Sequence, residues 1–141
     1  ARRPGKRSPV TAIDELATGK YLSLTTFRPD GTPVATPVWL VQRGDELLVL
    51  TQAQSGKAKR LRHDSRVLVA PCDARGTVKG EQRHGIARLQ DETQTHLTAS
   101  LIQHRYGLMG RVFAWLSEIR GGQSSGEHVG VTITLTDAPD A

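Results

Sequence analysis

The feature that most restricts the fold is an alternation of apolar and polar residues with a period of two. It is clearest at residues 129–136, where four branched aliphatic side chains alternate with glycine and threonine. This period is typical of a strand that buries one face. Further runs that predict strands cover residues 20–27, 32–42, 46–51, 67–72 and 81–89.

Turn signals separate the first three of these runs, at Pro29-Asp30-Gly31 and at Arg43-Gly44-Asp45. Strands joined by tight turns pair antiparallel, so the pattern predicts a meander. Pro33 and Pro37 lie within the second run and cannot donate to a strand ladder, so that strand should lie beside an edge, a gap or a bulge. We expect a mainly β fold of six or more antiparallel strands in a closed or nearly closed barrel, because closure removes exposed strand edges.

Three further segments are predicted to be helical, at residues 11–19, 55–64 and 91–106. The first two begin with residues suited to capping a helix, Thr11 and Ser55. Their core-facing residues would be Ile13 and Leu16 in the first helix and Ala58 and Leu61 in the second. The third would bury a stripe of Leu97, Leu101 and Ile102, and another apolar stripe is formed by Val112, Phe113, Leu116 and Ile119.

Composition bounds the organisation and the class of protein. Residues 1–10 are rich in Arg, Lys and Pro without periodicity, which predicts a disordered basic arm, and residues 11–141 are expected to form a single domain. No run of the 141 residues approaches the roughly 20 apolar positions of a membrane helix. The basic start is not followed by an apolar signal core. We therefore expect a soluble, cytoplasmic protein without a membrane partner.

The net charge of +5 is concentrated in two places. One is the basic arm, and the other is the segment 57–66, in which five basic residues oppose a single acid. A surface that follows a nucleic-acid backbone would spread its charge more widely, so we expect a local anion site and no nucleic-acid partner. The alternative of a small nucleic-acid-binding barrel is also disfavoured because the chain has two Phe, two Tyr and two Trp, few for base stacking.

The anion site is expected where the run 46–51 passes into the helix 55–64. A helix N-terminus presents unpaired N–H groups and partial positive charge, which suits a phosphate. Ser55 lacks a Glu or Gln three positions later, so no reciprocal capping box occupies those donors. Lys57 and Arg60 share one helical face and could converge on one phosphate. The plain alternative is that all five bases coat a solvated helix.

A second candidate is the segment from Thr36 to Trp39. Pro37 leaves a ladder position open, so neighbouring backbone groups could bond a planar heterocycle while Trp39 forms an apolar wall. The alternative is that Trp39 is part of the barrel core. Spacing alone does not decide between these readings.

Taken together, these segments resemble the split β-barrel, FMN-binding-like proteins similar to pyridoxamine 5′-phosphate oxidase, specifically the branch that uses the deazaflavin coenzyme F420. The resemblance covers about residues 16–89 and is weaker beyond Gln90. It is carried by Tyr21-Leu22-Ser23-Leu24-Thr25-Thr26, Gly31-Thr32-Pro33-Val34-Ala35-Thr36-Pro37-Val38-Trp39, Ser55-Gly56-Lys57-Ala58-Lys59-Arg60-Leu61-Arg62 and Arg66-Val67-Leu68-Val69-Ala70-Pro71-Cys72-Asp73.

The resemblance implies a homodimer with the cofactor in a groove between the subunits. It implies that Lys59 is a weaker candidate for the acidic oligoglutamate tail. It also implies that the lack of a cation at position 56, where flavin-binding relatives carry Arg or Lys, favours F420 over FMN. The implied cofactor-binding residues are Ser55, Gly56 and Lys57 at the phosphate, Arg60 as the adjacent base, Leu50 and Thr51 at a strand end beside phosphate and ring, and Thr36, Pro37, Val38 and Trp39 along the tricyclic ring.

The implied function is hydride transfer from reduced F420 to a conjugated or heteroaromatic small molecule. The alternatives are an FMN-dependent oxidoreductase and a non-enzymatic flavin or deazaflavin carrier, since a fold does not guarantee a reaction. We assign no catalytic residue. Tyr106, His104 and Arg83 are candidates for the substrate end of the groove, although a surface position is the simpler explanation for each.

No metal ion is expected either. The single cysteine, Cys72, follows Pro71 in an apolar run and cannot form an internal disulfide. The five histidines are scattered, without the Cys/His spacing that zinc sites use.

Overall fold

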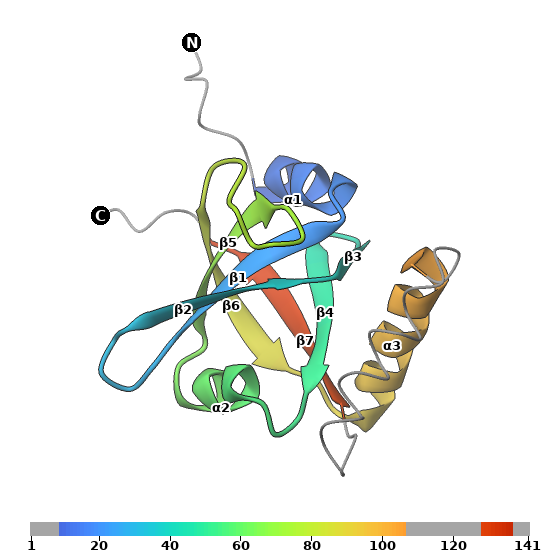
Figure 1. Cartoon of the computed structure of the whole chain (residues 1–141). Helices are drawn as coiled ribbons and strands as arrows, with labels where there is room; N and C mark the ends of the chain where they lie inside the picture. Colours follow the sequence, from blue (N-terminus) through green and yellow to red (C-terminus); the bar gives the residue numbers. More distant parts are fainter. Residues whose placement is uncertain (1–8, 107–127, 137–141) are drawn as a thin grey trace.

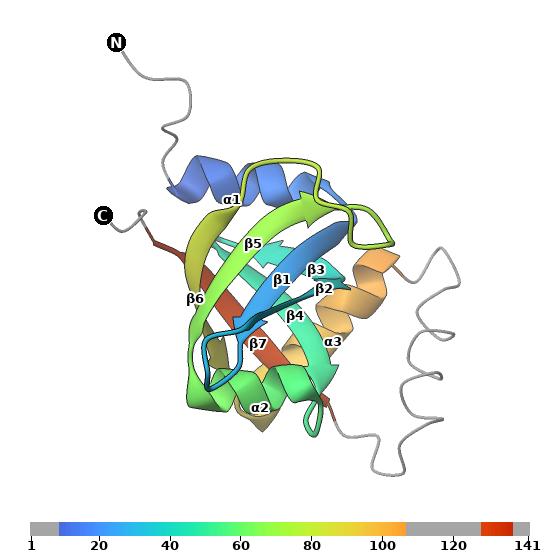
Figure 2. The same ribbon diagram turned by 60° about the vertical axis from the view of Figure 1, so that its left-hand side comes forward.

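The computed structural model describes residues 9–106 and 128–136, which form seven strands and three helices. The strands make one antiparallel sheet that curls into a barrel (Figures 1 and 2). This confirms the mainly β, split-barrel fold class. The elements are α1 (Pro9–Thr18), β1 (Tyr21–Phe27), β2 (Pro33–Val38), β3 (Leu40–Arg43), β4 (Glu46–Gln52), α2 (Gly56–His63), β5 (Arg66–Cys72), β6 (Arg83–Leu89), α3 (Glu92–Tyr106) and β7 (His128–Leu135).

The predicted strand over residues 32–42 is divided in two at Trp39. Its first half, β2, pairs with β1, and its second half, β3, pairs with β4. The sheet order is β2-β1-β5-β6-β7-β4-β3, so the two edges of the sheet are consecutive pieces of chain. The predicted meander is therefore correct only for the neighbouring pairs, because the middle strand crosses from one edge of the curled sheet to the other. Pro33 and Pro37 lie in the edge strand β2, as their missing N–H groups require.

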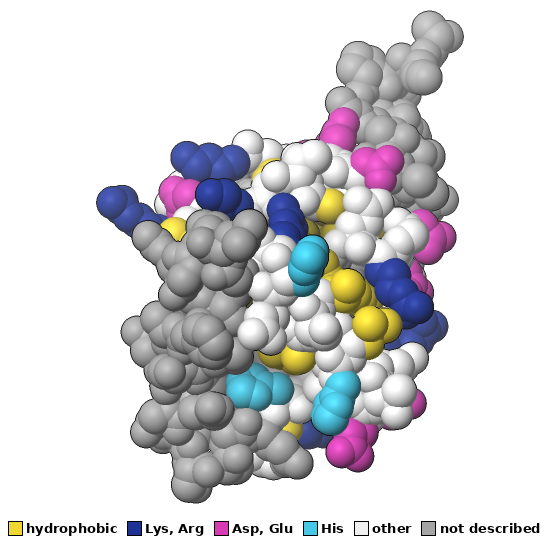
Figure 3. Space-filling view, turned by 90° about the vertical axis from the view of Figure 1, so that its right-hand side faces the viewer, with side chains coloured by type: hydrophobic (Ala, Val, Ile, Leu, Met, Phe, Trp, Pro, Cys, Tyr) yellow, Lys and Arg dark blue, Asp and Glu magenta, His cyan; other side chains and the backbone are white. Residues whose placement is uncertain are grey.

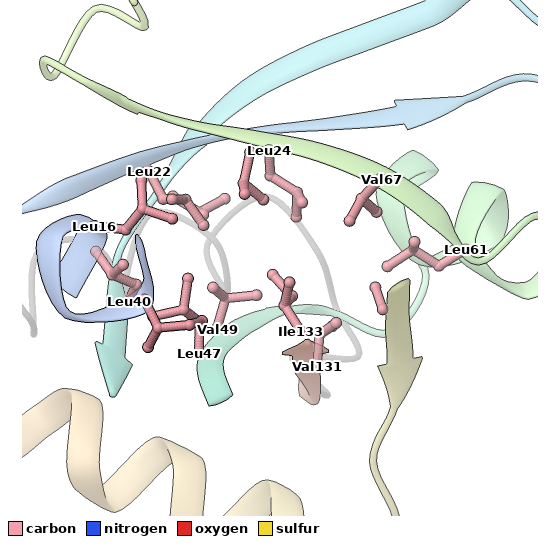
Figure 4. Close-up of a cluster of buried hydrophobic side chains, with 14 residues drawn as sticks. Leu16, Leu22, Leu24, Leu40, Leu47, Val49, Leu61, Val67, Val131 and Ile133 are labelled. Carbon is pink, nitrogen blue, oxygen red and sulfur yellow. The ribbon is translucent and has the colours of Figure 1, made fainter. Parts of the chain in front are cut away.

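The barrel interior is filled by aliphatic side chains from the strands and from two helices that cover its ends. α1 lies over one end and α2 over the other (Figure 2). Ile13 and Leu16 of α1 are buried, as are Ala58 and Leu61 of α2, in agreement with the predicted inward faces. Figure 4 shows the cluster, whose labelled members are Leu16, Leu22, Leu24, Leu40, Leu47, Val49, Leu61, Val67, Val131 and Ile133.

The start of α1 differs from the prediction. The helix begins at Pro9, so Thr11 lies inside it and is not the N-cap, and two residues assigned to the basic arm are helical. Proline is suited to the first position of a helix because its φ is already helical and it needs no acceptor for an N–H group. The remainder of the predicted arm lies outside the described residues.

α3 packs on the outside of the barrel and buries a different stripe from the one predicted. Ile102 is buried, but Leu97 is 38% exposed, and the other buried residues are Thr95, Thr98 and Tyr106. The threonines are tolerated there because their hydroxyls are hydrogen-bonded: that of Thr95 accepts from the Gly130 amide, and that of Thr98 donates to the Gln90 side chain. The apolar stripe predicted at residues 112–119 lies outside the described residues.

Within the described ranges, no helix is long and apolar enough to cross a membrane. The same ranges contain no group of three or more His, Cys, Asp or Glu side chains placed to hold a metal ion. On the side of the molecule that carries α3, histidine side chains stand apart from one another (Figure 3).

Candidate functional site

A pocket of about 230 Å³ lies where β2, the end of β4 and the start of α2 meet. These segments come together because the chain runs from β2 through Trp39 into β3, whose first residue pairs with Val49 of β4. Six of the ten predicted cofactor-binding residues line it, together with Gln52, which was not predicted. The lining residues are Pro37, Val38, Leu50, Thr51, Gln52, Ser55 and Lys57.

The start of α2 forms one wall of this pocket. Ser55 is the N-cap, as predicted, and its hydroxyl accepts from the Ala58 amide over 3.2 Å. The same hydroxyl lies 3.2 Å from Thr51 Oγ1 at the end of β4. Although Ser55 has no capping-box partner, its own hydroxyl therefore occupies one of the first amides of the helix, so that amide is not available to a ligand. The amides of Gly56 and Lys57 have no acceptor one turn earlier in the helix.

Lys57 and Arg60 form a partly buried pair of positive charges. Burial lowers the pKa of Lys57, and the charge of Arg60 lowers it further. Burial also lowers the pKa of Arg60, with Arg28 as the second cause. Neither Lys57 nor Arg60 forms an ion pair with a carboxylate within the described part of the chain. The site thus holds positive charge that an anionic ligand would neutralise.

One hydrogen bond and the free space beside Gly56 define the position of the Arg60 guanidinium. Its Nε donates to the Thr26 hydroxyl over 2.6 Å, and Thr26 has no exposed surface. Its Nη1 lies only 2.8 Å from the position that a Cβ on Gly56 would take, so the guanidinium is folded back toward the first residue of α2. Gly56 and Arg60 therefore belong to the same helix start as Lys57, although they do not line the pocket.

The remaining bases of the segment are directed elsewhere. Lys59 is exposed. Arg62 donates to the carbonyl oxygen of Ala53 over 2.9 Å. Arg66 pairs with Asp64 at 2.7 Å. The solvated-helix alternative thus describes these three bases but not Lys57 and Arg60.

Thr36 and Trp39 are not in the pocket. Thr36 lies on β2 opposite Leu24, and its hydroxyl oxygen is buried without a hydrogen-bond partner among the described residues. Trp39 is 7% exposed and stacks on Tyr106 in the cluster between the sheet and α3. Trp39 is therefore a core residue, but the alternative that it lies in the barrel core needs a correction, because its cluster lies outside the barrel interior.

The three candidates for a substrate end are spread over the molecule. Tyr106 is buried, contrary to the surface position considered for it, because its ring packs on Trp39 and its hydroxyl reaches backbone groups of the barrel. Burial raises the pKa of Tyr106. His104 is exposed on α3, and Arg83 lines a separate pocket beside α1. The structure therefore does not bring the three together.

Sequence reasoning missed Thr26. The signal was present in the alternation of β1, where Leu22, Leu24 and Thr26 share the core-facing row. A hydroxyl in such a row requires a hydrogen-bond partner. That partner is a basic residue 34 positions further along the chain, which no local pattern could indicate.

The sequence model of the family described as pyridoxamine 5′-phosphate oxidase matches residues 11–135. The comparison with curated proteins finds no significant match.

Several solved structures share the fold. A conserved hypothetical protein from Mycobacterium tuberculosis is similar at 25% identity and a TM-score of 0.66, over 95% of this chain and 84% of that one. The heme storage protein HutZ from Vibrio cholerae is similar at 16% identity and a TM-score of 0.63, over 94% and 93% of the two chains. A structure described as an F420 reductase is similar at 17% identity and a TM-score of 0.57, over 87% and 92%.

Proposed function

The chain belongs to the pyridoxamine 5′-phosphate oxidase family, and from this premise we propose that it is an F420-dependent oxidoreductase that reduces a conjugated or heteroaromatic small molecule. Family membership places it among cofactor-binding, oxidoreductase-like proteins. The choice of F420 is supported by the similarity to an F420 reductase, and the chemistry of the pocket suits the anionic end of such a cofactor.

The observation that carries the proposal is the pair of Lys57 and Arg60 at the start of α2, which no carboxylate of the described residues neutralises. An ammonium, a guanidinium and helix-terminal amides together suit the phosphate of a ribityl-linked cofactor. Thr51 and Ser55 add hydroxyls on the same side of the pocket. The donor set therefore fits the anionic end of either F420 or FMN.

The ring would lie along β2, next to Pro37 and Val38. Pro37 cannot donate a hydrogen bond, and Val38 is buried, so this wall is apolar. Reduced F420, when bound, supplies a hydride from a ring carbon. The residues of this chain would bind the anionic arm, orient the ring against β2 and keep water from that face. No residue of the chain is assigned a covalent or proton-transfer role.

The pocket of a single chain is small for such a cofactor. The pocket measures about 230 Å³, below the roughly 300–1,000 Å³ of pockets that enclose drug-sized ligands. We therefore propose a homodimer in which the partner supplies the remaining wall. Sedimentation velocity should give a dimer at the protein concentrations used for binding. A protein that is monomeric at those concentrations and still binds F420 would contradict this part of the proposal.

Fluorescence titration with F420 and with FMN tests the cofactor. Wild type should bind F420 more tightly than FMN, and Lys57→Ala should lose at least about tenfold in F420 affinity because a charge-assisted contact disappears. Lys20→Ala is the matched control, since it removes the same charge from an exposed position. Equal F420 affinities of Lys57→Ala and Lys20→Ala would refute the assignment of Lys57 to the site. Tighter binding of FMN than of F420 would refute the choice of cofactor.

Turnover separates an enzyme from a carrier. Reduced F420 should be oxidised in the presence of a panel of conjugated and heteroaromatic acceptors, at a rate that scales with protein concentration. Tight F420 binding without turnover of any acceptor would favour the carrier. Salt-sensitive binding of oligonucleotides, with neither cofactor retained, would favour the nucleic-acid-binding alternative.

A further inference from the structure

The side chain of Arg60 is held by a hydroxyl from inside the barrel. Thr26 lies in the core-facing row of β1 and is fully buried, whereas Leu22 and Leu24 fill the rest of that row with apolar groups. Its hydroxyl accepts from Arg60 Nε over 2.6 Å. A buried hydroxyl is costly without a partner, and an arginine side chain is costly to order, so the contact stabilises both groups in one arrangement.

The glycine at the start of α2 provides the space for this arrangement. A Cβ on Gly56 would lie 2.8 Å from Arg60 Nη1, closer than such atoms approach in proteins. Gly56 is a helical residue and is not among the glycines with positive φ, so the backbone does not require a glycine there. The absence of a side chain at position 56 therefore leaves space for the guanidinium and is not required by the backbone conformation.

The arrangement brings two like charges together. Lys57 and Arg60 lie three residues apart on α2, and the charge of Arg60 lowers the pKa of Lys57 in addition to the larger effect of burial. Left free, the guanidinium would move toward solvent and away from Lys57. The Thr26 hydroxyl opposes that movement before any ligand arrives, which reduces the ordering cost of binding.

We propose that Thr26 is a positioning residue that holds Arg60 over the first turn of α2, in the space left by Gly56, so that Arg60 and Lys57 are presented to one anionic group. This inference rests on the proposed function, since the anionic group is taken to be the phosphate of the cofactor. It adds a residue outside the pocket, and it explains why position 56 carries no side chain.

A double-mutant cycle with F420 tests the coupling. Arg60→Ala should weaken binding by about tenfold or more, and Thr26→Val by at least about threefold, because valine keeps the shape but removes the acceptor. Thr26→Ser should bind like wild type. In the Arg60→Ala background, Thr26→Val should cost nothing further. An equal loss in both backgrounds, or wild-type affinity in Thr26→Val, would overturn the proposal.

Gly56→Ala should weaken F420 binding without lowering the stability of the fold. Alanine is favoured over glycine in a helix, so the melting temperature should stay the same or rise. The new Cβ displaces the guanidinium, so F420 affinity should fall by at least about threefold. Unchanged affinity in Gly56→Ala would contradict the spatial part of the proposal.

A readout without the cofactor distinguishes this proposal from the proposed function. The Nε–H proton of Arg60, followed by nitrogen-15 NMR, should exchange slowly with water in wild type and Thr26→Ser but rapidly in Thr26→Val. If wild type binds neither F420 nor FMN, the proposed function fails, and inorganic phosphate becomes the probe. Phosphate should then shift the Arg60 signal in wild type but not in Thr26→Val. Rapid exchange in wild type, or the same phosphate response in both proteins, would refute the positioning role.

Discussion

The ring of Trp39 stacks on that of Tyr106, with centroids 4.5 Å apart and the planes inclined by 8°. Trp39 is the residue at which the predicted strand over 32–42 leaves one edge of the sheet for the other. The Tyr106 hydroxyl accepts from the Leu40 amide over 3.2 Å and lies 2.9 Å from the carbonyl oxygens of both Lys20 and Leu40. α3 therefore fixes the crossing that places β2 beside the end of β4.

Removal of that hydroxyl should destabilise the fold. Tyr106→Phe leaves the buried Leu40 amide without its acceptor while keeping the stacked ring, and should lower the free energy of unfolding by about 1–3 kcal/mol. Urea unfolding followed by tryptophan fluorescence measures this change. Tyr21→Phe is the control because Tyr21 packs against the same cluster but is only half-buried. Equal stability losses in the two variants would contradict the role given to the Tyr106 hydroxyl.

As the pH rises, the affinity for an anion should begin to fall at a lower pH than it would if Lys57 had the pKa of an ordinary lysine. Burial and Arg60 hold the pKa of Lys57 below its usual 10.5. Below that lowered pKa the ammonium is charged and binds the anion. As the pH rises through this lowered pKa, Lys57 of the free protein loses its ammonium proton, and the affinity for the anion falls. F420 titrations from pH 7 upward should show this fall, and Lys57→Arg should delay it because arginine stays charged. Identical pH profiles for the two proteins would exclude Lys57 as the cause.

Asp64 should contribute stability that disappears in acid. The Arg66 side chain and amide hold the pKa of Asp64 at about 2, below its usual 3.8. A lowered carboxyl pKa stabilises the fold above the unfolded-state value, and the contribution is lost as the pH falls from about 3.8 toward 2. Solvent screens this exposed pair, so Asp64→Asn should cost at most about 1 kcal/mol at pH 7. Denaturant unfolding should show most of the difference at pH 7 and little of it near pH 2, and Asp45→Asn, at an exposed position, is the control.

Gly130 is expected to resist replacement by alanine. An added Cβ would overlap the Gln90 side-chain amide, whose nitrogen donates to Thr132 and whose oxygen accepts from Thr98. Displacement of that amide leaves partly buried polar groups without partners, so Gly130→Ala should lower the free energy of unfolding by about 2 kcal/mol. Gly19→Ala, where a Cβ would meet only ordinary contacts, is the matched control in thermal unfolding. A Gly130→Ala protein as stable as Gly19→Ala would show that Gln90 is free to move.

Much of the local structure could be predicted because it depends on neighbouring residues. The turn at Gly31, with φ of 92°, follows from Pro29-Asp30-Gly31, and the cap of α2 follows from Ser55. The stripe on α3 could not be predicted by hydrophobicity, because Thr95 and Thr98 are buried through hydrogen bonds to residues outside the helix. Of their partners, Gly130 lies on β7 and Gln90 lies in the loop between β6 and α3.

The candidate site also has features that follow from neighbouring residues and features that depend on the tertiary structure. The sequence alone determined that a strand end, a serine cap and two cations one helical turn apart would adjoin, because these residues are close along the chain. Only the tertiary structure decided that β2 forms the opposite wall and that Trp39 packs against α3. It alone also placed the Thr26 hydroxyl on Arg60. Each of these relationships joins segments that are distant in sequence, and their meeting depends on how the sheet curls and which strands become its edges.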